Sequence, residues 1–177
     1  NKRNNSLMNS FKSLYELSNK YDILYVEDDE ASMLEIGSLF EDLFNKVDFA
    51  KDGNEGLEQY IDYNDINNKS YDIIITDIEM PSVNGIELSK NIYKLNKEQK
   101  IIVLSAHDES HYLIDLLNLG ITGYLQKPFN KKRILEVLYT VCKELDEDTK
   151  NKTEVKLNNG FVWHCDSKTL THEGQAI

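Results

Sequence analysis

Short apolar runs alternate with amphipathic segments along most of this chain. The runs are rich in β-branched and aromatic side chains, which is typical of strands buried on both faces of a parallel sheet. The predicted strands are residues 21–26, 47–50, 73–77, 101–104 and 123–125. Between them, apolar residues recur at helical spacing and predict helices over residues 30–44, 54–63, 85–95, 108–119 and 131–145. This alternation predicts an α/β fold with a parallel sheet that helices cover on both faces.

The two ends of the chain follow other patterns. Residues 1–20 form an N-terminal extension: residues 1–6 are polar and expected to be loose, and an amphipathic helix follows from Leu7. That helix either packs on its own domain or a neighbouring copy, or it binds a partner. Residues 146–154 contain no apolar side chain and predict a linker. Residues 155–177 combine short strand-like runs with turn signals such as Glu173-Gly174, and they predict a short antiparallel β meander.

Charge and cysteine content narrow the range of partners. The chain has 31 acidic residues against 20 Lys and Arg, a formal net charge of -11. Because binding to nucleic acid phosphates needs clustered positive charge, this argues against nucleic acid as a direct partner of these residues. Cys142 and Cys165 form no CxxC motif and are expected to be reduced thiols in the cytoplasm. No apolar run approaches the roughly 20 residues that span a bilayer, so no membrane partner is expected.

The end of the third predicted strand carries the first chemical signal. Asp77 stands at the carboxyl end of that strand, where open α/β sheets place ligand and reaction sites. The stretch from Asp77 to Gly85, Asp-x-x-Met-Pro-x-x-x-Gly, resembles the phosphoacceptor segment of bacterial response-regulator receiver domains. The resemblance covers residues 21–145. It implies a flavodoxin-like or CheY-like sheet of order 2-1-3-4-5, with Asp77 as the residue that receives a phosphoryl group. The alternative is that Asp77 only forms a turn or caps a helix.

Further acids follow the first predicted strand. Glu27 and Asp28 lie there, and the implied strand order brings them next to Asp77. Like charges so close raise one another's pKa unless a cation compensates, and oxygen ligands suit Mg²⁺. The resemblance implies that Asp28 and Asp77 bind Mg²⁺ directly, that Glu27 acts through water, and that the backbone carbonyl of Glu79 is a further ligand. Asp29 is predicted to be the N-cap of the following helix instead.

Phosphoryl transfer also needs positive charge around the transferred group. Lys127 follows the fifth strand and resembles the family lysine that pairs with the phosphoryl group, and the family holds the next bond, to Pro128, in cis. Ser105 matches the family's switch hydroxyl. Tyr124 resembles the switch aromatic, which turns inward when that hydroxyl moves; the alternative is an ordinary aromatic on a half-buried edge strand. His107 stands where receivers vary a residue that tunes loss of the phosphoryl group.

The C-terminal meander resembles the opening sheet of the winged-helix effector domain of OmpR/PhoB-type regulators. That resemblance implies a transcription regulator whose phosphoryl donor is a sensor histidine kinase and whose DNA contacts come only from residues beyond 177. It also implies that activation produces a homodimer through the face of residues 108–119, 123–125 and 131–145. Residues 120–124 lack the acid pair that is usual there, so this face is expected to be more apolar.

Two other functions fit the same motifs. The alternatives to a transcription regulator are a signalling adaptor without a DNA-binding output and a hydrolase with an aspartyl-phosphate intermediate. Such hydrolases place Asp-x-Asp after the first strand, where this chain has Glu27-Asp28-Asp29. For the receiver, no enzymatic turnover is expected beyond self-phosphorylation and slow self-dephosphorylation.

Overall fold

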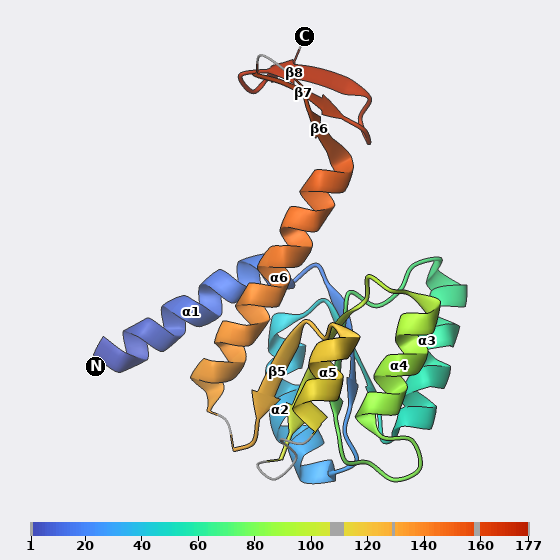
Figure 1. Ribbon diagram of the computed structural model, residues 1–177. Helices are drawn as coiled ribbons and strands as arrows, with labels where there is room; N and C mark the ends of the chain where they lie inside the picture. The colour runs from blue at the N-terminus through green and yellow to red at the C-terminus, as the bar shows by residue number, and fades with distance from the viewer. Residues whose placement is uncertain (1, 107–111, 129, 158–159, 177) are drawn as a thin grey trace. The chain divides into compact units, whose positions relative to one another are not determined.

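The central sheet has five parallel strands in the order β2-β1-β3-β4-β5 (Figure 1). The structure is a computed structural model that describes residues 2–106, 112–128, 130–157 and 160–176. The strands are β1 (Asp22–Val26), β2 (Lys46–Ala50), β3 (Ile73–Asp77), β4 (Lys100–Ser105) and β5 (Gly123–Gln126). The predicted fold class and strand order are therefore confirmed. In the register, Val26 of β1 lies beside Thr76 of β3, so these two strands end together.

Helices cover both faces of the sheet, as the alternating pattern predicted. They are α1 (Lys2–Ser18), α2 (Glu30–Leu43), α3 (Gly53–Asn67), α4 (Gly85–Leu95), α5 (Leu113–Leu119) and α6 (Lys131–Thr153). The core on one face contains Leu24 and Ile74 together with side chains of α3, α4 and α5. On the other face, Phe40 of α2 packs edge-on against Tyr25 of β1 at a centroid distance of 5.1 Å. Figure 1 shows α3 and α4 on the opposite side of the sheet from α2.

Three helices extend further than the sequence pattern predicted. Helix α1 begins at Lys2, although residues 1–6 were expected to be loose, and α3 continues to Asn67. Helix α6 runs to Thr153, through most of the predicted linker 146–154. Polar residues do not end a helix unless Gly, Pro or a cap interrupts it. Here an ion pair between Lys150 and Asp146, one turn apart at 2.9 Å, supports the extension. The role of 146–154 as a linker stays a prediction.

The C-terminal strands form a separate antiparallel sheet, as predicted. They are β6 (Glu154–Lys156), β7 (Phe161–His164), β8 (Thr169–His172) and β9 (Gln175–Ala176), and they pair in that order. This sheet belongs to the second of two compact units, which divide the chain between Val141 and Cys142. Both cysteines, Cys142 and Cys165, are free thiols. Among the described residues, none of the helices has the length and apolar character that crossing a bilayer requires.

Helix α1 packs on its own domain, which is one of the two alternatives that the sequence left open. Leu14 is completely buried, and the hydroxyl of Ser18 donates a hydrogen bond to the carbonyl oxygen of Leu43, the last residue of α2, at 2.7 Å. Ser18 is also completely buried. Of the other apolar side chains of the helix, Leu7, Met8 and Tyr15 are exposed, whereas Phe11 and Leu17 are half-buried. The last turns of α1 are therefore part of the core of the first unit.

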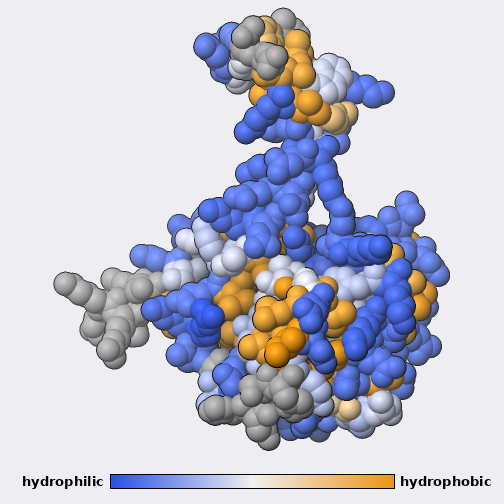
Figure 2. Space-filling view, viewed as in Figure 1, coloured by the Kyte–Doolittle hydropathy of each residue, from blue (hydrophilic) through white to orange (hydrophobic). Residues whose placement is uncertain are grey.

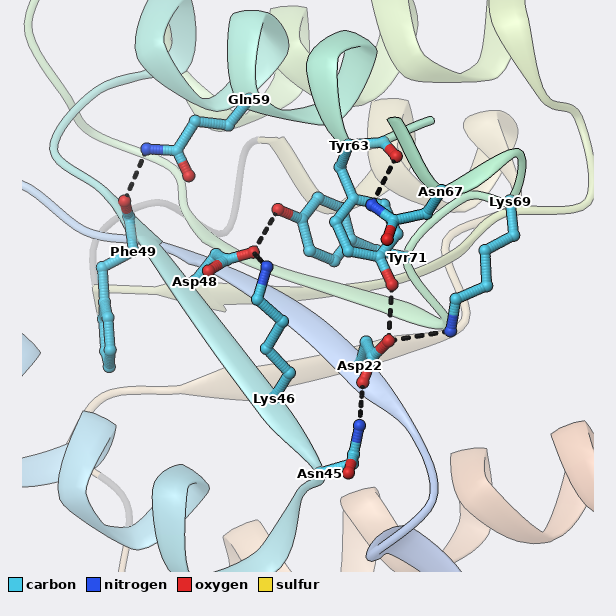
Figure 3. A network of polar contacts seen from close by, with 10 residues as sticks. All are labelled: Asp22, Asn45, Lys46, Asp48, Phe49, Gln59, Tyr63, Asn67, Lys69 and Tyr71. Atoms are coloured by element: carbon cyan, nitrogen blue, oxygen red, sulfur yellow. Dashed lines mark hydrogen bonds and ion pairs between the residues drawn. The ribbon is translucent and has the colours of Figure 1, made fainter. Parts of the chain in front are cut away.

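A polar network connects residues at the edge of the sheet where β1 and β2 begin (Figure 3). The carboxylate of Asp22 accepts hydrogen bonds from Tyr63 Oη at 2.5 Å, Asn45 Nδ2 at 2.6 Å and Lys69 Nζ at 2.7 Å. The ring of Tyr63 stacks on Tyr71 with a centroid distance of 3.8 Å. These contacts fix the end of α3 and the segment that follows it, which explains why α3 does not stop at residue 63.

We expect Asp22→Asn to lower the free energy of unfolding at pH 7 by about 2 kcal/mol, since three donors then face a neutral amide. Burial disfavours the charged form of Asp22 and by itself raises the pKa of this carboxyl group. The hydrogen bonds from Lys69, Tyr63 and Asn45 outweigh the effect of burial, so the pKa of Asp22 is lowered. A carboxylate with a lowered folded-state pKa stabilises the protein above its unfolded-state pKa, and the contribution is lost as the pH falls through the folded-state pKa.

Urea unfolding at pH 7 and at progressively lower pH measures this effect. The difference between wild type and Asp22→Asn should shrink as the pH falls, whereas Asp62→Asn, on the exposed side of α3, should change little at any pH. A difference that stays constant with pH would contradict the role of the charge.

Candidate functional site

Three carboxylates meet at the carboxyl ends of β1 and β3. Because these strands are neighbours that end together, Glu27 and Asp28, just after β1, come to lie beside Asp77, the last residue of β3. One carboxylate oxygen from each of the three residues lies within 4.8 Å of the others. This placement agrees with the convergence that the sequence predicted. Three hard oxygen donors at this spacing fit a small divalent cation such as Mg²⁺.

The three acids differ in their contact with water. Glu27 is completely buried and Asp77 nearly so, whereas Asp28 is exposed. Burial raises the pKa of Glu27, and the negative charge of Asp77 raises it further, while Lys127 works in the opposite direction. A cation that binds here therefore relieves a repulsion that the fold itself creates.

Lys127 supplies positive charge to the acid cluster. Its Nζ lies 3.1 Å from Glu27 Oε2 and 3.2 Å from Asp77 Oδ1. Its backbone N–H donates to the carbonyl oxygen of Ser105 at 2.6 Å, so the ends of β4 and β5 hold it in place, and the bond to Pro128 is cis, as the resemblance implied. Burial opposes the charge of Lys127, but Asp77 and Glu27 outweigh it and raise its pKa. Lys127 is therefore a cation at neutral pH.

The backbone around Asp77 is fixed by close contacts. The hydroxyl of Thr76 donates to the carbonyl oxygen of Asp77 at 2.9 Å, and Ile78 N donates to Leu104 O at 3.1 Å. Gly85, the first residue of α4, sits so near that a Cβ on it would overlap the Asp77 carbonyl oxygen. The glycine of the Asp-x-x-Met-Pro-x-x-x-Gly stretch thus allows α4 to begin directly against the strand end.

The other predicted residues lie around the same rim. Ser105 ends β4, is buried, and donates a hydrogen bond to Ala106 O at 3.1 Å. Tyr124 is half-buried in β5, opposite Val103, and packs against the core. Glu79 is exposed, two residues after Asp77. The assigned functions of Ser105, Tyr124 and Glu79 stay predictions, as do those of Asp77, Asp28, Glu27 and Lys127.

The histidines and Asp29 have simpler surroundings. Asp29 caps α2 by accepting a hydrogen bond from Ser32 N at 2.7 Å, which confirms its predicted N-cap role. His107 lies outside the described residues. In the C-terminal sheet, His164 lies 3.5 Å from Glu154, and His172 packs against the ring of Phe161.

Sequence reasoning missed one residue of the site. The hydroxyl of Tyr25 donates to Glu27 Oε2 at 3.2 Å. Burial and the charge of Glu27 raise the pKa of Tyr25, so this hydroxyl keeps its proton. The signal was present in the sequence, because residues two apart in a strand point to the same face. The same tyrosine also belongs to the apolar run of residues 23–26, and that run by itself predicts only a buried strand.

Comparison with known proteins gives a consistent result. The family described as "Response regulator receiver domain" matches residues 23–139. Transcriptional regulatory protein DegU of Brevibacillus brevis is 32% identical over 99 residues, which cover 56% of this chain and 39% of DegU. Response regulator ArlR of Staphylococcus saprophyticus is 27% identical over 157 residues, 88% of this chain and 65% of ArlR. The chain therefore spans less than two thirds of either relative.

A solved structure supports the same fold. The crystal structure described as the CheX-CheY-BeF3-Mg+2 complex from Borrelia burgdorferi is similar to this chain with a TM-score of 0.64 and 25% identity. The similarity covers 75% of this chain and 97% of the matched chain.

Proposed function

Because this chain belongs to the response regulator receiver domain family, we propose that Asp77 accepts a phosphoryl group from a sensor histidine kinase in a Mg²⁺-dependent reaction. The observation that carries the proposal is the position of Lys127 Nζ, which lies 3.2 Å from Asp77 Oδ1 beside three convergent carboxylates. A nucleophile, a fixed cation and a set of hard oxygen ligands at one point are the parts that phosphoryl transfer requires.

In the proposed reaction, a carboxylate oxygen of Asp77 attacks the phosphorus atom while the bond to the donor's imidazole nitrogen breaks. The product is an acyl phosphate on Asp77. Lys127 is already poised at Asp77 and pairs with the phosphoryl oxygens. Asp28, Asp77, the carbonyl of Glu79 and, through water, Glu27 would hold Mg²⁺, which supplies positive charge to the transferred group when bound. Apart from self-phosphorylation and slow loss of the phosphoryl group, no turnover is proposed.

The proposed switch uses Ser105 and Tyr124. Ser105 sits one residue beyond Leu104, the partner of Asp77 in the sheet, so it lies at the same end of the sheet as Asp77. Ser105 would exchange its hydrogen bond to Ala106 O for one to a phosphoryl oxygen. Tyr124, half-buried on β5, would move inward in response. Such a change is a two-state shift that one modification biases.

The proposed dimer forms through α5, β5 and α6. Figure 2 shows apolar surface on this side of the molecule, over α5, where Ile114 and Leu117 are 70% and 64% exposed. Exposed apolar patches of this kind mark interaction surfaces. They support the expectation that this face is less charged than is usual for OmpR/PhoB-type regulators.

For the output, we propose transcription regulation through DNA binding by residues outside this chain, with an adaptor role as the second candidate. The name of DegU and the length of the ArlR match, which exceeds the family segment, favour the first. The likeness to a CheY structure favours the second. Both candidates share the proposed phosphoacceptor role in the cytoplasm.

The test is labelling of the purified chain with acetyl phosphate. We expect about one phosphoryl group per chain with Mg²⁺ and none after chelation with EDTA, since the acids then repel both one another and the phosphoryl oxygens. Hydroxylamine should remove the label, as it does from an acyl phosphate, and peptide mapping should locate it on Asp77. Metal-independent labelling, or a label on another residue, would refute the proposal.

A further inference from the structure

The carboxylate of Glu27 is held by three donors of different kinds. Its Oε2 accepts a hydrogen bond from the Tyr25 hydroxyl at 3.2 Å and faces Lys127 Nζ at 3.1 Å. Its Oε1 accepts from the backbone N–H of Asp29 at 3.2 Å. Of these donors, Lys127 is shared with Asp77, and under the proposed function it turns to the phosphoryl group. The Tyr25 hydroxyl and the Asp29 backbone N–H then remain, so each carboxylate oxygen of Glu27 keeps one hydrogen-bond donor.

The hydroxyl of Tyr25 is fixed by the packing of its ring. Tyr25 is completely buried, and it contacts Phe40 edge-on at 5.1 Å and Phe49 at 6.3 Å between centroids. Helix α2 approaches this cluster closely, because Gly37 has no side chain: a Cβ there would lie 2.6 Å from Phe49 Cε1. A ring packed on several sides keeps its polar tip in one place.

We propose that Tyr25 is a positioning residue for the cation site: its hydroxyl holds the Glu27 carboxylate in the orientation in which it supports the bound Mg²⁺, including when Lys127 moves to the phosphoryl group. This inference rests on the proposed function of the same site. A tyrosine suits the task because it is a neutral donor. It orients the carboxylate without cancelling the negative charge that attracts the cation.

The alternative is that the hydrogen bond only satisfies a buried hydroxyl. Tyr60 offers a matched control, because it is also a buried tyrosine, and its hydroxyl bonds to Gln99 Oε1 at 3.0 Å and Ser70 Oγ at 3.1 Å. Neither partner belongs to the acid cluster. Tyr25→Phe and Tyr60→Phe each remove one buried hydroxyl and keep the ring.

The experiment measures the Mg²⁺ dissociation constant of the full chain by isothermal titration calorimetry. Tyr25→Phe should weaken Mg²⁺ binding about tenfold, the lower end of the effect of losing a partner that orients a metal ligand. Tyr60→Phe should stay within about twofold of wild type. Wild-type affinity in a folded Tyr25→Phe protein would overturn the inference.

A double-mutant cycle separates positioning from general damage. If Tyr25 acts through Glu27, Tyr25→Phe should have no further effect on Mg²⁺ affinity once Glu27→Gln is present. An undiminished loss in that background would overturn the inference. A wild-type chain that does not bind Mg²⁺ at all would instead refute the proposed function.

A measurement on the wild-type chain does not depend on the variants. With tyrosines labelled at the ¹³Cζ atom, the NMR signal of Tyr25 should shift as Mg²⁺ saturates the chain, while that of Tyr60 should not. A Tyr25 signal that stays in place through saturation would contradict the inference even if Tyr25→Phe failed to fold.

Discussion

Asp77→Asn is expected to abolish labelling by acetyl phosphate and to leave the folded protein as stable as wild type or more so. A neutral amide cannot form the acyl phosphate, so the loss is complete. The same change removes a charge that repels Glu27 and thereby lowers the pKa of Glu27. Lys127 keeps Glu27 as its partner at 3.1 Å. Function and stability should therefore separate in this variant.

Intact-mass spectrometry, light scattering and urea unfolding measure the three consequences. Asp77→Asn should take up no phosphoryl group, should not change its oligomeric state with acetyl phosphate, and should unfold at the same or a higher urea concentration. Asp29→Asn is the matched control, since Asn caps a helix as well as Asp does and this acid lies outside the metal cluster. Equal labelling of wild type and Asp77→Asn would remove Asp77 from its role.

Gly85→Ala is expected to lower the free energy of unfolding by about 3 kcal/mol and to impair phosphorylation at the same time. The added Cβ would overlap the carbonyl oxygen of Asp77 and come within 3.1 Å of Thr76 Oγ1. Both contacts are with the strand end that carries the nucleophile, and a backbone atom cannot move aside as the tip of a flexible side chain can. Helix α4 must shift, and Asp77 shifts with it.

Urea unfolding and the rate of labelling by acetyl phosphate measure this outcome. Gly120→Ala is the control: Gly120 has a φ of 78°, but a Cβ there would meet nothing within 4 Å. Its cost should come from the backbone alone, about 1 kcal/mol, with the labelling rate unchanged. Normal labelling by Gly85→Ala would show that the strand end tolerates the displacement.

The central sheet and the acid cluster could be predicted because both depend on local patterns. Strands buried in a parallel sheet can be recognised as apolar runs in the sequence. Neighbouring parallel strands end at the same edge of the sheet, so the strand order predicts that Glu27, Asp28 and Asp77 lie close together. That order came from the resemblance, since alternation of strands and helices fixes no neighbours. Lys127 was predicted as a partner of the phosphoryl group. Its pairing with both Glu27 and Asp77 could not be predicted, because it depends on the positions of the three side chains in the folded protein.

The features that escaped prediction depend on contacts between distant residues. The Asp22 network joins Asn45, Tyr63 and Lys69, and no spacing in the sequence connects these side chains. The extension of α6 was not predicted for another reason: residues 146–154 carry no apolar side chain, and apolar periodicity is the signal that predicts a helix. The ion pair between Lys150 and Asp146, one turn apart, shows that a polar segment can continue a helix.

The packing of α1 has a practical consequence for fragments of this protein. The family segment begins at residue 23, yet the fully buried Leu14 and Ser18 precede it, and so does Asp22 with its three donors. An expression fragment that begins at residue 23 would lack the buried side chain of Leu14. It would also leave the Leu43 carbonyl oxygen without its hydrogen bond from the Ser18 hydroxyl. The part of the chain that folds as a unit therefore begins before residue 23, where the match to the family begins.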